Sequence, residues 1–235
     1  MAKMVGYACS IKLQWLNLAV QLLKENLSEV DYKEKMNKYL SFEIDSPTRL
    51  RKTREILMNV WYYDSEEIAP IRKEALDLIE KYPEHDAAIH LCLIYLAYPV
   101  VADVCKFIGK IFEFQDEVTN AILKQKLYDE WGERGTLEAT TRRVTLTLKD
   151  MDILKAETKT RYVANKRIIS NEKLVNFILS VAMRIAGNNY YSFTVIKAFP
   201  FLFPFEFSVS KEQLMTDERF IISNFGGELT VALKC

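Results

Sequence analysis

Glycine and proline are scarce in this chain, whose 235 residues include only seven Gly and six Pro. Because these residues punctuate turns and interrupt regular elements, long stretches without them favour helices. Leu, Ile, Lys and Glu recur at helical spacing through those stretches. The sequence therefore predicts a mainly α protein, and its apolar content of 49% is sufficient for a buried core.

The familiar motifs of catalysis are also missing. The chain has no Gly-rich phosphate loop, no Gly-x-Ser-x-Gly and no His-Glu-x-x-His. Its two histidines, His85 and His90, would diverge by about 140° on a helix, a poor arrangement for sharing a metal ion. We therefore expect no enzyme activity, no cofactor, no metal site and no small-molecule substrate.

The four cysteines are far apart and form no Cys-x-x-Cys pair. Without a secretory signal to favour disulfides, this pattern predicts a cytoplasmic protein in which Cys92 and Cys105 are core residues.

No long apolar run is present either. The strongest candidate for a membrane segment, residues 87–101, contains no Lys, Arg, Asp or Glu, but it is shorter than the roughly 20 residues that a membrane-spanning helix needs, and Pro99 interrupts it. It predicts two buried helices that meet at Pro99, and no membrane partner.

The patterning divides the chain into three parts. Residues 1–114 are expected to form an all-helical domain, residues 115–170 a winged helix-turn-helix-like segment, and residues 171–235 a small α/β segment. Ser46 and Pro47 mark the start of one helix in the first part. Gly226-Gly227, between two apolar runs, marks a hairpin in the last.

Residues 135–154, GTLEATTRRVTLTLKDMDIL, fit two structures. Alternating Thr and apolar residues at 144–148 favour a strand. Thr136 is instead a suitable N-cap, which favours a helix. The apolar stripe of that helix would contain Leu137, Thr141, Val144, Leu148 and Met151. We favour the helix.

The opposite face of this helix would display Ala139, Arg142, Leu146 and Lys149, with Glu138 and Arg143 at its edges. Small and cationic side chains on an exposed helix face suit insertion into the major groove of DNA, where Arg can donate twice to guanine.

Charge is concentrated around this segment although the whole chain is neutral, with 32 basic and 32 acidic residues. Residues 136–170 carry eight basic and four acidic side chains, a surplus of four. Phosphate contacts require such a local excess. The cations expected on the wing are Lys159, Arg161, Lys166 and Arg167.

A second basic cluster begins the helix at Pro47. Its cations are Arg49, Arg51, Lys52 and Arg54, at the end of a helix where the dipole disfavours positive charge. They form either a solvated face or a second surface that contacts phosphates.

Three segments, SPTRLRKTREILMNVWY, the block at 135–154 and the ending FPFEFSVSKEQLMTDERFIISNFGGELTVALK, resemble the BrxA family of accessory proteins from bacterial BREX phage-resistance systems. The resemblance implies a largely helical, non-enzymatic protein that binds double-stranded DNA alongside other phage-defence proteins. It supplies no residue-level binding motif. The alternative that the residues leave open is a protein-interaction adaptor without affinity for nucleic acid.

Overall fold

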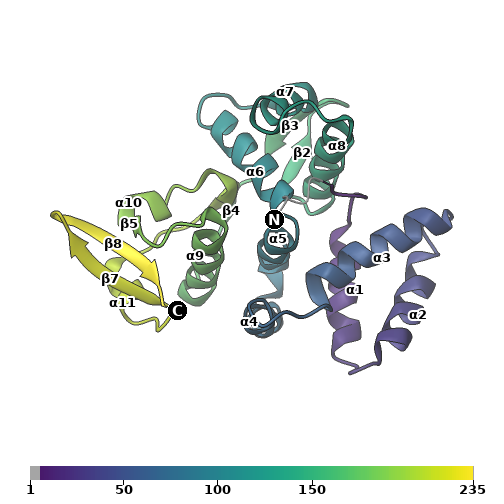
Figure 1. Ribbon diagram of the computed structural model, residues 1–235, viewed down its shortest axis with the longest axis horizontal. Helices are drawn as coiled ribbons and strands as arrows, with labels where there is room; N and C mark the ends of the chain where they lie inside the picture. Colours follow the sequence, from purple (N-terminus) through teal and green to yellow (C-terminus); the bar gives the residue numbers. More distant parts are fainter. Residues whose placement is uncertain (1–5, 235) are drawn as a thin grey trace.

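The computed structural model describes residues 6–234 and is mainly α-helical, as the sequence predicts (Figure 1). Its first part consists of helices joined by short connections. These are α1 (Leu13–Leu23), α2 (Glu29–Leu40), α3 (Pro47–Trp61), α4 (Ala69–Lys81), the 3-10 turn η1 (Pro83–His85) and α5 (Asp86–Ala97). Helix α3 begins as predicted, with Pro47 in its first turn and the Ser46 hydroxyl accepting a hydrogen bond from the Arg49 N–H at 3.4 Å.

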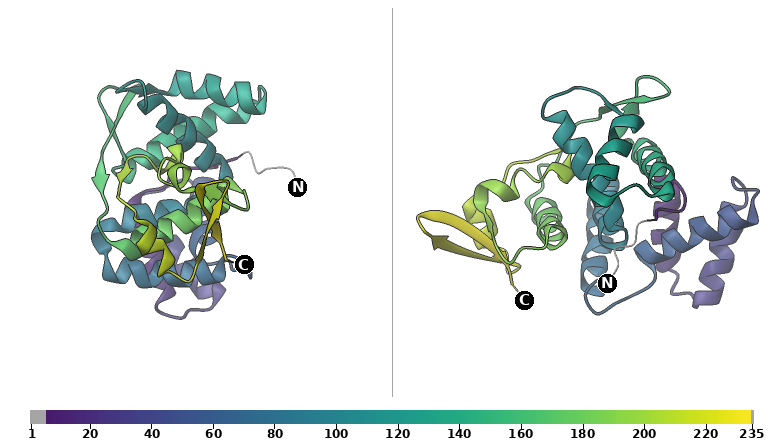
Figure 2. Two further views of the ribbon diagram at one scale, coloured as in Figure 1. Left: turned by 90° about the vertical axis from the view of Figure 1, so that its left-hand side faces the viewer. Right: turned by 45° about the horizontal axis from the view of Figure 1, so that its top comes forward.

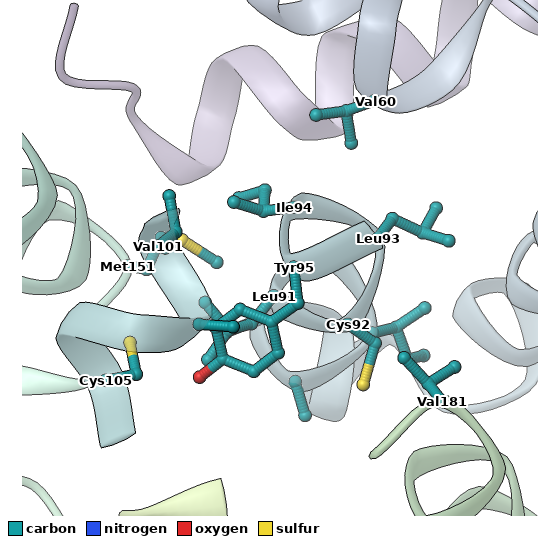
Figure 3. Close-up of a cluster of buried hydrophobic side chains, with 14 of the residues drawn as sticks. Val60, Leu91, Cys92, Leu93, Ile94, Tyr95, Val101, Cys105, Met151 and Val181 are labelled. Atoms are coloured by element: carbon teal, nitrogen blue, oxygen red, sulfur yellow. The ribbon is translucent and has the colours of Figure 1, made fainter. Parts of the chain in front are cut away.

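Helix α5 lies at the centre of the core, because residues on all of its faces are buried. Figure 3 shows side chains from other elements around it: Val60 from α3, Val101 and Cys105 from α6 (Pro99–Phe112), and Val181 from α9 (Glu172–Ala186). The predicted pair of buried helices meeting at Pro99 is therefore confirmed, as is the burial of Cys92 and Cys105. Within residues 6–234, no helix combines the length and the apolarity that crossing a membrane requires.

The middle of the chain has the topology of a winged helix. Helix α6 is followed by β1 (Val118–Thr119), α7 (Asn120–Trp131), α8 (Gly135–Asp150), β2 (Leu154–Ala156) and β3 (Arg161–Ala164). The three strands form an antiparallel sheet in the order β1-β3-β2, with Val118 opposite Tyr162 and Leu154 opposite Ala164. Because α6 supplies the first helix of this unit, the winged helix extends to the N-terminal side of residue 115.

Helix α8 confirms the helical interpretation of the Thr-rich segment. Its predicted stripe, from Leu137 to Met151, is buried, while Arg142 and Lys149 are exposed. The helix begins at Gly135, so the prediction of Thr136 as N-cap is wrong: Arg134 holds that position, and Thr136 lies in the first turn.

The C-terminal part packs against α6. It contains β4 (Arg167–Ile168), α9, β5 (Tyr191–Ser192), α10 (Phe193–Ile196), the 3-10 turn η2 (Pro200–Leu202), β6 (Phe205–Glu206), α11 (Lys211–Met215), β7 (Phe220–Phe225) and β8 (Glu228–Leu233). β4 pairs with β6 in parallel, and β5, β8 and β7 form an antiparallel sheet. The predicted hairpin is present, with positive φ angles at Gly226 and Gly227. Gly109 of α6 lies so close to the Pro200 carbonyl that any side chain there would overlap it.

Candidate nucleic-acid interface

The two basic clusters found in the sequence meet across one groove. The groove has a volume of about 500 Å³ and separates α8 from the first turns of α3. Arg142 and Arg143 line it on the α8 side, and Arg49 and Lys52 line it on the α3 side. In Figure 1 and in the right-hand view of Figure 2, the two helices lie on the same side of the molecule, and the segment leading into α1 passes between them.

Within the described part of the chain, these four cations have no acidic partner. Among the described residues, no carboxylate lines the groove, and none lies within ion-pair distance of Arg49, Lys52, Arg142 or Arg143. Arg49, Lys52 and Arg142 are exposed, and Arg143 is half-buried. Uncompensated charges of one sign along a concave surface focus the electrostatic field, so this groove attracts anions.

The floor of the groove is the N-terminal segment, represented by Ala8, Cys9 and Ser10. This segment is held against α8 by three hydrogen bonds. The buried Ile11 N–H donates to the Thr147 hydroxyl at 2.9 Å, Arg143 Nη1 donates to the Tyr7 carbonyl at 3.2 Å, and the Thr147 and Tyr7 hydroxyls are 3.5 Å apart. The position of α8 relative to the helical first part is therefore fixed, and Arg143 has a structural bond in addition to its place in the groove.

The cations predicted on the wing are in a different situation, because most of them pair with carboxylates. Arg161 pairs with Glu117 at 3.3 Å, Lys166 with Glu206 at 2.8 Å and Arg167 with Asp152 at 2.8 Å. The hydrogen bond to Glu206 raises the pKa of the Lys166 ammonium. Exposed ion pairs of this kind are weak, but each carboxylate reduces the local positive potential.

The remaining predicted cations are either exposed outside the groove or mostly buried. Lys159 is exposed at the wing tip and Lys149 in the last turn of α8, both outside the groove lining. Arg51 is exposed on another side of α3. Arg54 is mostly buried, and it pairs with Glu55 at 2.7 Å and donates to Asn37 at 3.1 Å.

The histidines and acidic residues offer no alternative site. Within residues 6–234, no group of three His, Cys, Asp or Glu side chains is arranged to hold a metal ion. His90 is fully buried between Trp61, whose indole N–H donates to Nδ1 at 3.0 Å, and Asn17, whose Oδ1 lies 2.8 Å from Nε2. Burial lowers the pKa of His90 to about 3, so this imidazole is neutral and part of the core.

The four cations of the groove could be predicted from the sequence, but the shape of the groove could not. The floor residues Ala8, Cys9 and Ser10 and the neutral donors Ser46 and Thr48 of the α3 side also line the groove. Ser46 is visible in the sequence only as a helix cap, and the floor residues have no pattern that identifies them.

Comparison of the chain with protein-family models, with curated proteins and with solved structures finds no match. The arrangement of charges and helices described above is therefore the basis for assigning a function.

Proposed function

We propose that this protein binds double-stranded DNA without catalysing a reaction, and that α8 is the helix that enters the major groove. One observation carries the proposal: the exposed face of the third helix of a winged-helix unit borders a groove with four unpaired cations and no carboxylate among its described lining residues. In helix-turn-helix proteins the corresponding helix contacts base edges, while neighbouring elements contact the backbone.

The composition of the α8 face supports this use. Arg142 projects from the middle of the exposed face, between the half-buried side chains of Ala139 and Leu146. An arginine flanked by small or apolar side chains can approach a base edge, donate two hydrogen bonds to guanine and leave room for a thymine methyl group. The structure gives this guanidinium no carboxylate or carbonyl partner among residues 6–234 that would compete.

A salt titration tests the proposal. Fluorescence anisotropy with a labelled 20-base-pair duplex should show binding at low salt, and log affinity should fall linearly with log salt. Arg142→Gln should weaken binding about tenfold, because a hydrogen bond to a charged group is lost. Arg184→Gln, at an exposed position of α9 outside the groove, is the matched control and should leave the affinity nearly unchanged.

Arg142 is a better target than Arg143, whose substitution would also remove the bond to Tyr7. If the wild-type protein does not bind duplex at 50 mM salt, the proposal fails and an adaptor role, in which the groove accepts an acidic protein segment, becomes the better explanation. The sequence resemblance adds the proposal that the DNA-bound protein works in the cytoplasm with other proteins of a bacterial phage-defence system.

A further inference from the structure

We infer that the α3 side of the protein's groove binds the phosphate backbone of one DNA strand. This is the strand that borders the DNA major groove into which α8 inserts. This inference rests on the proposed function and deepens it, because it assigns the helical first part of the chain a share in DNA binding. The winged-helix unit would then supply only half of the site.

The placement of the α3 cations is the first argument. Arg49 and Lys52 are three residues apart, so they project from the same face of α3, and both line the groove. Arg51, between them in sequence, lines a separate hollow on another side of the helix together with Lys38 and Arg54. The cations of this cluster are therefore divided between two surfaces, and only Arg49 and Lys52 are directed toward α8.

The size of the groove is the second argument. A volume of about 500 Å³ is that of a small-molecule pocket. A duplex is far wider, since its major groove alone measures about 12 Å and accommodates a whole helix. With α8 in the major groove, only the bordering sugar–phosphate strand can occupy the space between α8 and α3.

The neutral lining is the third argument. Ser10, Ser46 and Thr48 add hydroxyl groups to the four cations. Hydroxyls, lysines and arginines are common ligands of phosphate oxygens, whereas adenine is read by Asn or Gln and cytosine by Asp or Glu. Among the described lining residues, the α3 side has none of these four types, so its cations and hydroxyls suit a phosphate backbone.

The test uses the full-length protein, a labelled 20-base-pair duplex of arbitrary sequence and one of its single strands, titrated between 50 and 200 mM NaCl. The variants are Arg49→Gln, Lys52→Gln, their combination and the control Arg51→Gln. Each single groove variant should weaken duplex binding about tenfold. Each should also reduce the slope of log affinity against log salt by about 0.9, which is one phosphate contact, and the combination should reduce it by about twice as much. All three positions are exposed, so thermal unfolding should stay unchanged and confirm that the variants fold.

Arg51→Gln distinguishes direct contact from general electrostatic attraction, because it removes the same charge two residues from Arg49 and one residue from Lys52. We expect it to change affinity less than threefold and to leave the salt slope as in the wild type. If it weakens binding as much as Arg49→Gln, α3 acts only through net charge and the inference is overturned.

The other outcomes distinguish the inference from the proposed function. Wild-type binding that depends on Arg142 but not on Arg49 or Lys52 would overturn the inference and leave the proposed function standing. No duplex binding at all would overturn both. Equal affinity for the single strand, with the same dependence on Arg49 and Lys52, would also overturn the inference, because binding would then not require a major groove.

Discussion

Replacing Arg49 with glutamate should make the protein more stable while abolishing most of its DNA binding. Arg49 is the third residue of α3, and its backbone N–H is capped by the Ser46 hydroxyl. Arg49→Glu would create the sequence Ser-x-x-Glu at the start of a helix. In this capping box the glutamate side chain accepts a hydrogen bond from the N–H of the cap residue.

The expected gain can be estimated from the helix dipole. A cation in the first turn is unfavourable by about 0.3–1 kcal/mol, and an anion there is favourable by a similar amount. Exchanging one for the other, with no ion pair to break, should therefore raise the free energy of unfolding by about 1 kcal/mol. For a chain of this length, that corresponds to an increase in Tm of about 2–4 °C.

Calorimetry of the wild type, Arg49→Glu and Arg51→Glu would measure this effect. Arg51 is equally exposed but lies beyond the first turn, so its substitution makes the same change of charge without a capping box. Its Tm should stay within about 1 °C of the wild type, because surface substitutions without a specific contact have small effects. A Tm for Arg49→Glu that is equal to or below that of Arg51→Glu would refute the reasoning, since Arg49 would then contribute to folding.

Three further substitutions, two of them with a matched control, test the packing of the fold by urea unfolding. Burial lowers the pKa of His90 to about 3 from the ordinary 6.5. The imidazole therefore takes up a proton more readily in the unfolded chain than in the folded protein. Lowering the pH from 7.5 to 5 should therefore cost about 2 kcal/mol of unfolding free energy through this residue, and His90→Gln should remove that part of the pH dependence. Gly109→Ala should destabilise the protein by about 1–3 kcal/mol because its methyl group overlaps the backbone of η2, whereas Gly135→Ala has open space around it and should be neutral. Thr147→Val should cost about 1–3 kcal/mol by leaving a buried N–H of the N-terminal segment without an acceptor. Thr140→Val, on the same helix, removes a buried hydroxyl that has no hydrogen-bond partner among residues 6–234 and should cause no loss of stability.

The helical nature of α8 could be predicted from the sequence despite its threonines, and the structure explains why they are tolerated. Thr141 and Thr147 donate their hydroxyl protons to the carbonyls of the preceding turn, at 2.8 and 3.0 Å. Thr145 donates to Asn120 of α7 at 2.8 Å. Bonds within the turn satisfy a buried hydroxyl without breaking the helix. The strand-like alternation at 144–148 arises because α8 is buried on several sides. Alternation of apolar residues is therefore a weak guide to whether this segment is a helix or a strand.

The groove itself could not be predicted, because it depends on tertiary contacts. Arg49 and Arg142 are 93 positions apart in sequence, and no local pattern indicates that α3 and α8 lie on opposite sides of one groove. Counting charges along the chain also treats Arg142 and Arg167 alike. Only the fold shows that Arg167 is beside Asp152 and that Arg142 has no such neighbour among the described residues.

The contrast between paired and unpaired cations is the strongest physical reason to expect an anionic partner at the groove. Arg72 is buried, pairs with Asp64 and donates to the Val60 carbonyl at 3.1 Å; Arg219 bridges Glu74 and Asp217. Removing either guanidinium would leave buried polar groups unsatisfied and destabilise the fold. By contrast, the side chains of Arg49, Lys52 and Arg142 satisfy no buried group among residues 6–234, and Arg49 lies where the helix dipole opposes its charge. A cation that folding does not require, held at a position where it costs stability, is explained if its partner is outside the chain. Substitutions of Arg49, Lys52 or Arg142 should therefore affect binding without affecting stability, whereas substitutions of Arg72 or Arg219 should affect stability.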